Sequence, residues 1–311
     1  MSSVANASTG WKSHFPFQAQ WFEHDSHRMH YVDEGSGPPL ICVHGNPTWS
    51  FMWRKVITEF SSDHRVIAVD HIGCGLSDKP QNYDYCLATH INNLANLIES
   101  LALSDVTLVA HDWGGPIGLG ALLRHRDKFK RIVLLNTAAF PPPYCPLRIR
   151  ACRWPLIGEF GVRGLNLFAR AAVTMAVHKT RMPPDIRDGF LAPYCNWHDR
   201  IAVVRFVQDI ALSSKHKTWP VLNSLERDLK QLESLPTQFI WGMQDWCFNK
   251  TCIDRLCDIF PHAELARLAD AGHYVVEDAP EEVIGHLREF LANSPLPSST
   301  QSGDSDSHSR A

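Results

Sequence analysis

The clearest chemical signal in this chain is an aspartate at the junction between a buried run and a helix. Residues 106–115 read VTLVAHDWGG, in which an apolar stretch ends at Asp112. Small residues two positions to either side, Ala110 and Gly114, permit a sharp turn that lifts the side chain above a sheet edge. A carboxylate there can attack a saturated carbon without first losing a proton, and the attack forms an ester on the protein. We therefore predict Asp112 as the nucleophile. The alternative is an aspartate that only caps the following helix.

Hydrolysis of such an ester requires a general base and an acid that orients it. His273 lies in ADAGHYVVEDAP, directly after the last predicted strand, and Asp245 lies in FIWGMQDWCF, in the loop after the preceding strand. The chain order nucleophile, acid, histidine is that of the α/β-hydrolase fold, and a carboxylate can hold an imidazole in the required tautomer. Asn136 occupies the other place where an acid could stand, but an amide cannot take that role. A turn-forming aspartate and an ordinary loop histidine are the alternatives.

Two further residues could hold an anion beside Asp112. Residues 41–54 read ICVHGNPTWSFMWR, a strand that enters a loop. In this fold one oxyanion-binding N–H comes from that loop and the other from the residue after the nucleophile, which gives Asn46 and Trp113. Their side chains add an amide and an indole donor, so we predict both in the site. Core packing for Trp113 and loop stabilisation for Asn46 are the alternatives.

The elements that must position these residues are short β-branched runs alternating with helical patterns. Continuous apolar strands separated by helices indicate a mostly parallel sheet covered on both faces. We predict an α/β-hydrolase fold with an eight-stranded sheet. The strands with predicted bounds are Arg28–Asp33, Pro39–His44, Arg65–Asp70, Val106–His111, Arg131–Asn136, Thr237–Gly242 and Glu264–Ala269, and the clearest helices are Leu87–Leu103, Gly115–His125 and Glu281–Leu291.

The alternation divides the chain into regions. We expect a flexible N-terminus over residues 1–14 and a core formed by 15–137 and 236–291. Residues 138–235 are mostly helical, rich in arginine and begin with three prolines, so we predict a helical cap inserted after the sixth strand. The last stretch, 292–311, is rich in Ser, Pro and Asp, and we expect disorder there.

Composition narrows the class of protein. Of the 311 residues, 44% are apolar and 20% are charged, and the formal net charge is −3, which gives no reason to expect nucleic-acid binding. No apolar run approaches the roughly 20 residues that span a bilayer. The nine cysteines are odd in number and form no C-x-x-C pair, so we expect free thiols in a reducing, cytoplasmic setting.

These motifs together resemble those of haloalkane dehalogenases. The matching pieces are HGNPTWSF (44–51), DHIGCGLSDKP (70–80), HDWGG (111–115), WGMQD (241–245) and AGHYVVEDAP (271–280), and the resemblance extends from about residue 15 to 291. It implies hydrolysis of a small apolar haloalkane by water, with halide held by Asn46 and Trp113 and with no metal or organic cofactor. The position of the acid is similar to that of the third dehalogenase subfamily.

The same residues also resemble β-lactone decarboxylases of olefin biosynthesis. LLNTAAF (134–140), RFVQDI (205–210) and the arginine-bearing cap carry this second resemblance. It would give the cap a role in holding alkyl tails, in contacting partner enzymes or in homo-oligomers. We expect dehalogenation to be the activity of the protein, with β-lactone decarboxylation as the alternative. An epoxide hydrolase would need two cap tyrosines, for which only Tyr144 and Tyr194 are available, and a non-catalytic ligand-binding protein is the remaining alternative.

Pocket residues are expected among the large aromatic side chains near the site and in the cap. The candidates are Trp49, Phe140, Phe168, Trp197, Phe206 and Trp246.

Overall fold

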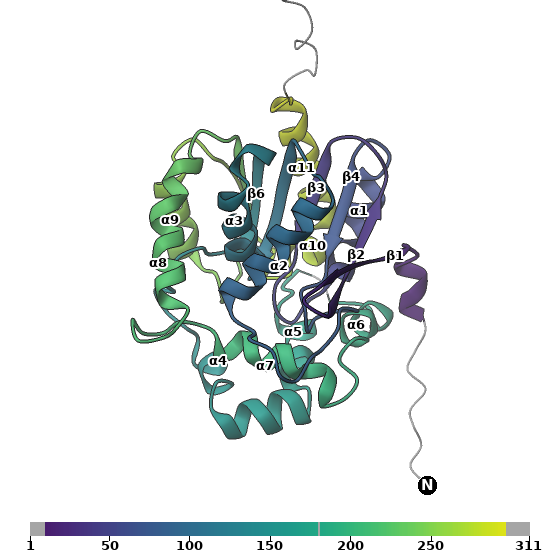
Figure 1. The fold of residues 1–311 in the computed structure, drawn as a ribbon, viewed down its shortest axis with the longest axis vertical. Helices are drawn as coiled ribbons and strands as arrows, with labels where there is room; N and C mark the ends of the chain where they lie inside the picture. The colour runs from purple at the N-terminus through teal and green to yellow at the C-terminus, as the bar shows by residue number, and fades with distance from the viewer. Residues whose placement is uncertain (1–9, 180, 297–311) are drawn as a thin grey trace, which may run out of the picture.

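The computed structural model describes residues 10–179 and 181–296. Its centre is an eight-stranded sheet in the order β1-β2-β4-β3-β5-β6-β7-β8 (Figure 1). The strand β2 is antiparallel to both of its neighbours, β1 and β4, and every other neighbouring pair is parallel. This confirms the predicted fold. The strands are β1 (Ala19–His24), β2 (His27–Glu34), β3 (Pro39–Val43), β4 (Arg65–Val69), β5 (Val106–Asp112), β6 (Phe129–Thr137), β7 (Thr237–Gly242) and β8 (Glu264–Leu268).

Alternate side chains of the central strands serve the two faces of the sheet, as the period of two requires. In β3, Ile41 and Val43 belong to one apolar cluster, whereas Leu40 and Cys42 belong to the other. Helices cover both faces (Figure 1). One face packs against α2 (Leu87–Ser100), α3 (Gly114–Arg124), α8 (Trp219–Asp228), η6 (Leu229–Leu232) and α9 (Lys250–Ile259), and the other against η2 (Ser50–Trp53), α1 (Arg54–Phe60), α10 (Val275–Asp278) and α11 (Pro280–Asn293).

The strand β1 corresponds to none of the seven strands whose residue ranges were predicted from the sequence. It is an edge strand whose side chains alternate between exposed and half-buried, with Trp21 41% exposed. Because neither face is fully buried, it lacks the continuous apolar run by which the inner strands are recognised. It pairs only with β2, at the antiparallel end of the sheet.

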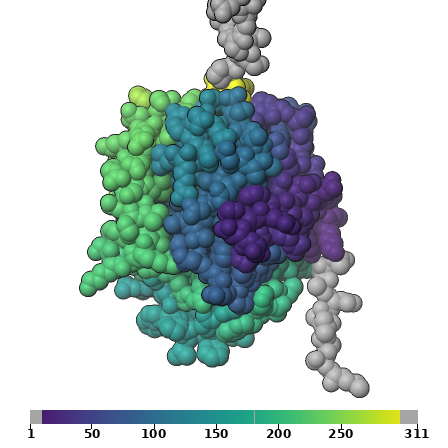
Figure 2. Space-filling model, in the orientation of Figure 1, coloured from purple at the N-terminus to yellow at the C-terminus, as the bar shows by residue number. Residues whose placement is uncertain are grey.

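Between β6 and β7 the chain leaves the sheet for a helical insertion. The helices over the sheet edge are α4 (Leu147–Ala151), the π-helix η4 (Ile157–Gly164), α5 (Leu167–Met175), α6 (Pro184–Leu191), η5 (His198–Arg200) and α7 (Ile201–Gln208). The last part of the insertion differs in its packing: Leu222 and Leu225 of α8 lie in the sheet-facing core cluster. The earlier part of the insertion, which includes α4, α5 and α7, forms the lower end of the molecule in Figures 1 and 2, whereas α8 lies beside the sheet.

The predicted terminal segments are described only in part. Residues 10–14 form a short 3-10 helix, η1 (Gly10–His14), whose Trp11 packs edge-on against Trp49 at 5.7 Å between ring centroids. The flexible N-terminus expected over 1–14 is therefore corrected for this part, because an aromatic contact orders it. At the other end α11 runs to Asn293, two residues beyond the expected boundary. The remainder of the expected tail, 297–311, and residues 1–9 lie outside the described residues.

All nine cysteines are free thiols. Within the described residues, no helix combines the length and apolar character required to cross a membrane.

Candidate active site

The aspartate predicted as nucleophile lies on a strained turn at the end of β5. Asp112 has φ +52°, in the left-handed region that non-glycine residues rarely adopt, and it is directly followed by α3. The neighbouring glycines make this turn possible: a Cβ at Gly45 would lie 2.0 Å from Asp112 Oδ1, and one at Gly114 would lie 2.1 Å from the Val43 carbonyl oxygen. Thr137 donates its hydroxyl hydrogen bond to the Asp112 carbonyl from the end of β6. The turn thus presents the carboxylate while its backbone is held from both neighbouring strands.

The carboxylate of Asp112 is buried and partly stabilised by backbone donors. Burial raises its pKa above the usual range, while His273 and the N–H groups of Trp113 and Asn46 act in the opposite direction. The Asn46 N–H donates to Asp112 Oδ1 at 2.8 Å. An aspartate that is desolvated yet ionised is a stronger nucleophile than one in water, because fewer solvent hydrogen bonds must be broken on attack.

His273 lies between the two predicted carboxylates. Its Nδ1 is 2.8 Å from Asp245 Oδ2, and its Nε2 is 3.6 Å from Asp112 Oδ2. Because a carboxylate can only accept, Nδ1 carries the proton and Nε2 faces Asp112. Burial disfavours the charged imidazole, but the charge and hydrogen bond of Asp245 and the charge of Asp112 outweigh it and raise the pKa of His273. The geometry therefore suits either a base or a stabilising cation beside Asp112.

Asp245 is held ionised in a fully enclosed position. Burial would raise its pKa, but the charge and hydrogen bond of His273 and the backbone donors of Cys247 and Phe248 lower it. The Cys247 N–H donates to Oδ1 at 2.6 Å. The three residues predicted as nucleophile, base and acid are therefore brought together.

Asn136 holds Asp245 in position, a role that its sequence position alone did not indicate. From the sequence it is recognised only as an amide at the other place where the acid could stand. Its Nδ2 donates to Asp245 Oδ2 and to the Gly242 carbonyl, each at 3.0 Å, and its Oδ1 accepts from the Gly242 N–H at 2.8 Å. It thus fixes the loop after β7 to the end of β6. A polar side chain at the end of a buried strand was the available signal.

A second such residue is His111, directly before the nucleophile. Its Nε2 lies 2.8 Å from the carbonyl oxygen of His273, so that nitrogen must carry the hydrogen. Burial lowers the pKa of His111 to about 3, which keeps the ring neutral. The neutral ring fixes the backbone that carries His273.

The two residues predicted to bind an anion, Asn46 and Trp113, line the same cavity but differ in what their side chains contact. The side-chain amide of Asn46 donates to the carbonyl of Val203 in α7 at 3.1 Å, and its Oδ1, which is buried, accepts no hydrogen bond from the described residues. Trp113 lines the cavity with its ring 5.4 Å from that of Phe206. One of the two hydrogens of the Asn46 amide is therefore used by Val203, which leaves the other for a ligand anion.

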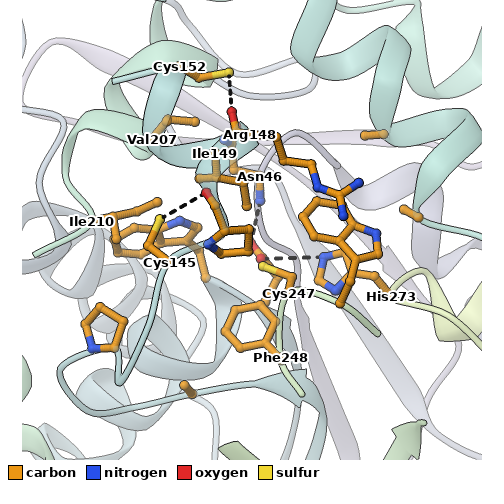
Figure 3. Close-up of a pocket in the computed structure, with 18 of the residues that line it drawn as sticks. Asn46, Cys145, Arg148, Ile149, Cys152, Val207, Ile210, Cys247, Phe248 and His273 are labelled. Atoms are coloured by element: carbon orange, nitrogen blue, oxygen red, sulfur yellow. Dashed lines mark hydrogen bonds and ion pairs between the residues drawn. The ribbon is translucent and has the colours of Figure 1, made fainter. Parts of the chain in front are cut away.

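The cavity above Asp112 is large and almost entirely apolar. Its volume is about 360 Å³, and it runs from Asp112 and His273 toward the helices of the insertion. In Figure 3 the side chains of Asn46 and His273 face the same space as the apolar side chains of Ile149, Val207 and Ile210. Such a space accommodates a substrate with substantial hydrocarbon parts.

Three of the aromatic residues expected in the pocket line it: Phe140, Phe168 and Trp246. The other three do not. Trp49 is fully buried under η1 and donates to the Gly189 carbonyl, Phe206 lies behind Trp113, and Trp197 is exposed on the cap. Aromatic type alone cannot separate core, surface and lining positions.

Only one of the two tyrosines required by the epoxide-hydrolase alternative is in place. Tyr144 lines the cavity, but Tyr194 is buried elsewhere and donates to the Thr48 carbonyl at 3.2 Å. Among the described residues, no group of three or more His, Cys, Asp or Glu side chains is placed to hold a metal ion.

The sequence of the chain is similar to those of known proteins, which identifies its family. Residues 38–151 match the family described as alpha/beta hydrolase fold. A cis-3-alkyl-4-alkyloxetan-2-one decarboxylase from Shewanella oneidensis is 40% identical over 282 residues, covering 89% of each chain, and one from Xanthomonas campestris is 39% identical, covering 86% of this chain and 93% of its own. Haloalkane dehalogenase 2 from Mycobacterium bovis is 31% identical, covering 88% of this chain and 95% of its own.

A solved structure supports the same fold. The haloalkane dehalogenase DatA from Agrobacterium tumefaciens has a TM-score of 0.81 at 23% identity, covering 89% of this chain and 97% of that one. The predicted resemblance is thus confirmed, but the ranking within it changes, because the decarboxylases share more of the sequence than the dehalogenases do. The chain is an enzyme of the α/β-hydrolase family, in the group that contains haloalkane dehalogenases and cis-3-alkyl-4-alkyloxetan-2-one decarboxylases.

Proposed function

We propose that the protein decarboxylates cis-3,4-dialkyl β-lactones, giving an alkene and carbon dioxide, with Asp112 as nucleophile. The observation that carries the proposal is the identity of 40% and 39% with proteins named for this reaction, against 31% with a dehalogenase. The apolar cavity of about 360 Å³ suits a ring that bears two hydrocarbon chains. The expectation that put dehalogenation first is therefore revised.

In the first step Asp112 attacks C4 of the lactone. A new bond forms between a carboxylate oxygen and C4 while the bond from C4 to the ring oxygen breaks, with inversion at C4. The ring opens to an ester on Asp112 and a free β-carboxylate. The departing group is an anion, so the donors of Asn46 and Trp113 that would hold a halide in a dehalogenase would hold this carboxylate instead.

In the second step the ester is expelled rather than hydrolysed. The electron pair of the bond between C3 and the carboxylate forms the double bond, carbon dioxide leaves, and the C4 ester bond breaks to return Asp112 as a carboxylate. No water is consumed. Inversion followed by anti elimination keeps the two alkyl groups cis. The charged form of His273, 3.6 Å from Asp112 Oδ2 and paired with Asp245, stabilises the expelled carboxylate.

Dehalogenation is the second candidate. Here the same attack releases halide, and neutral His273 activates water to hydrolyse the ester. The dehalogenase relative supports it, and the two side-chain N–H donors would hold a halide as well as a carboxylate. The two reactions share their first step and differ in whether the ester carries a β-carboxylate.

The test is a paired substrate panel. Wild type and Asp112→Asn are given cis-β-lactones with short alkyl chains and terminal bromoalkanes of matched length, and kcat/KM is measured from alkene and halide release. We expect kcat/KM for the lactone to exceed that for the bromoalkane by at least about a hundredfold, and Asp112→Asn to lose both activities. A folded wild type that releases halide but forms no alkene would reverse the assignment.

A further inference from the structure

The helical insertion carries an exposed apolar surface that the fold and the proposed chemistry leave unused. Six side chains of this surface, which we term the cap patch, are 52–80% exposed. They are Leu147, Trp154, Leu156, Phe160, Leu165 and Leu167. Monomeric proteins in water rarely keep so many large apolar side chains together on one segment unless something covers them.

The cap patch is carried by three helices that follow one another along the chain, and by the turns between them. Leu147 begins α4, Phe160 lies in η4, and Leu167 begins α5. A Cβ at Gly161 of η4 would lie 3.4 Å from Leu167, so these two helices are in direct contact. The segment, teal in Figure 2, forms the end of the molecule farthest from the C-terminal end of α11.

The charge around the cap patch is predominantly positive. Residues 141–175 contain five arginines and a single acidic residue, Glu159. Glu159 is paired with Arg163 at 3.0 Å, whereas among the described residues neither Arg150 nor Arg170 forms an ion pair. This local excess contrasts with the net charge of −3 of the whole chain. Exposed Trp, Phe and Leu flanked by arginine is the composition of interfacial helices that lie on anionic bilayers.

The cap patch also borders the mouth of the cavity. Leu167 belongs to both, being 52% exposed and lining the cavity, and the lining residues Tyr144 and Met175 are 38% and 42% exposed. Arg148 lies on this rim, with its guanidinium 3.7 Å from the centroid of the Trp246 ring. An apolar substrate dissolved in lipid could therefore pass from the bilayer into the cavity without crossing water.

We propose that the cap patch docks the enzyme on the surface of an anionic lipid bilayer, with η4 and the flanking segments at the level of the headgroups and the cavity mouth facing the hydrocarbon. The arginine excess favours an anionic lipid surface, because arginine beside exposed apolar side chains complements both the headgroup charge and the hydrocarbon. A symmetric contact between two copies of this chain would instead bring the same positive charges together. The inference concerns where the substrate is taken up and does not depend on which bond Asp112 breaks.

The experiment is flotation of the full chain with vesicles of phosphatidylcholine alone or mixed with phosphatidylglycerol. We expect wild type to float with the mixed vesicles and to float less as salt is raised. Trp154→Ser/Leu156→Ser/Phe160→Ser should lower the partition coefficient by at least about tenfold. Arg150→Glu/Arg170→Glu should lower it by more than about tenfold on the anionic vesicles.

Matched controls lie outside the cap patch. Trp21→Ser removes an aromatic side chain that is 41% exposed on β1, and Arg124→Glu/Lys230→Glu changes the charge by the same amount as the cap pair. Both should bind vesicles like wild type. None of the variants alters a residue of the cavity or catalytic site, so turnover of a short-chain, water-soluble substrate reports that each is folded, and vesicle binding is read independently of which substrate is turned over.

Two outcomes would overturn the proposal. One is wild type that does not float with either vesicle type. The other is loss of binding in the controls equal to that in the cap variants. Sedimentation without lipid identifies the alternative occupant: a self-associated wild type that the triple serine variant converts to monomers would assign the cap patch to a second copy of this chain.

Discussion

Replacing Asp245 by asparagine removes one charge from a buried pair without changing its shape. The carboxylate is fully enclosed and lies 2.8 Å from His273 Nδ1. Two unit charges about 4 Å apart at an effective dielectric constant of about 20 attract by about 4 kcal/mol. The charged imidazole that assists expulsion of Asp112 loses that stabilisation, so kcat for alkene formation should fall about a thousandfold.

The assay separates the two chemical steps. Because attack on C4 does not require the charged imidazole, Asp245→Asn should still form the Asp112 ester, and the intact protein should gain the mass of the lactone during turnover. Asp209→Asn is the matched control. It neutralises another buried aspartate, which accepts from Thr218 Oγ1 at 2.6 Å and lies outside the site. Its stability should fall while its kcat stays within about threefold of wild type.

An Asp245→Asn variant that keeps wild-type kcat and accumulates no ester would refute the proposed role of the charged His273 in expelling Asp112. That result would mean that the pair between Asp245 and His273 does not take part in the slow step.

Three further predictions concern pH, substrate size and stability. Alkene formation requires ionised Asp112 and charged His273, and the pKa of each is raised, so its rate should fall as pH drops through the pKa of Asp112 and as pH rises through the pKa of His273. Steady-state turnover of bromoalkanes requires neutral His273 to hydrolyse the ester, so it should rise with pH through the pKa of His273. Parallel pH profiles for the two reactions would contradict this. Ala211→Phe places a ring in the cavity wall and should lower kcat/KM at least about tenfold for the longest accepted alkyl chains but not for the shortest; equal loss for all lengths would contradict it. Glu277→Gln leaves the buried Arg54 without its charged partner and should lower the free energy of unfolding by about 3–5 kcal/mol in a denaturant titration, with kcat unchanged; a loss below about 1 kcal/mol would show that the pair contributes little.

The positions of the proposed catalytic residues could be predicted because each follows a recognisable local pattern. Asp112 ends the buried strand β5, and His273 lies in the loop after the last strand, β8. The carboxyl ends of parallel strands meet at one edge of a sheet, so separation along the chain does not separate the two residues in space. Asp245 is brought to His273 for the same reason. The edge strand β1 lacks this pattern, because its half-exposed side chains resemble those of a loop.

The hydrogen-bond partners of the Asn136 and Asn46 side chains could not be predicted, because they depend on which groups lie beside each amide in three dimensions. Nothing in the sequence indicates that Asn136 donates to Asp245 or that the Asn46 side chain donates to Val203 of the insertion. The pocket aromatics show the same limit: Phe206 and Phe140 are both buried, but only Phe140 lines the cavity.

The choice between the two related reactions rests on the surroundings of the site rather than on the proposed catalytic residues. Asp112, His273, Asp245, Asn46 and Trp113 serve equally for a halide or for a tethered carboxylate as the leaving anion. The fate of the ester then depends on whether water reaches it before carbon dioxide departs.

The most direct test is a single turnover of a cis-dialkyl β-lactone in ¹⁸O-labelled water, with the product and the Asp112 peptide both examined by mass spectrometry. We predict a cis-alkene, released carbon dioxide and an unlabelled Asp112, because no water attacks the ester. Formation of a β-hydroxy acid together with ¹⁸O in the Asp112 side chain would contradict it, since the enzyme would then hydrolyse the lactone rather than decarboxylate it.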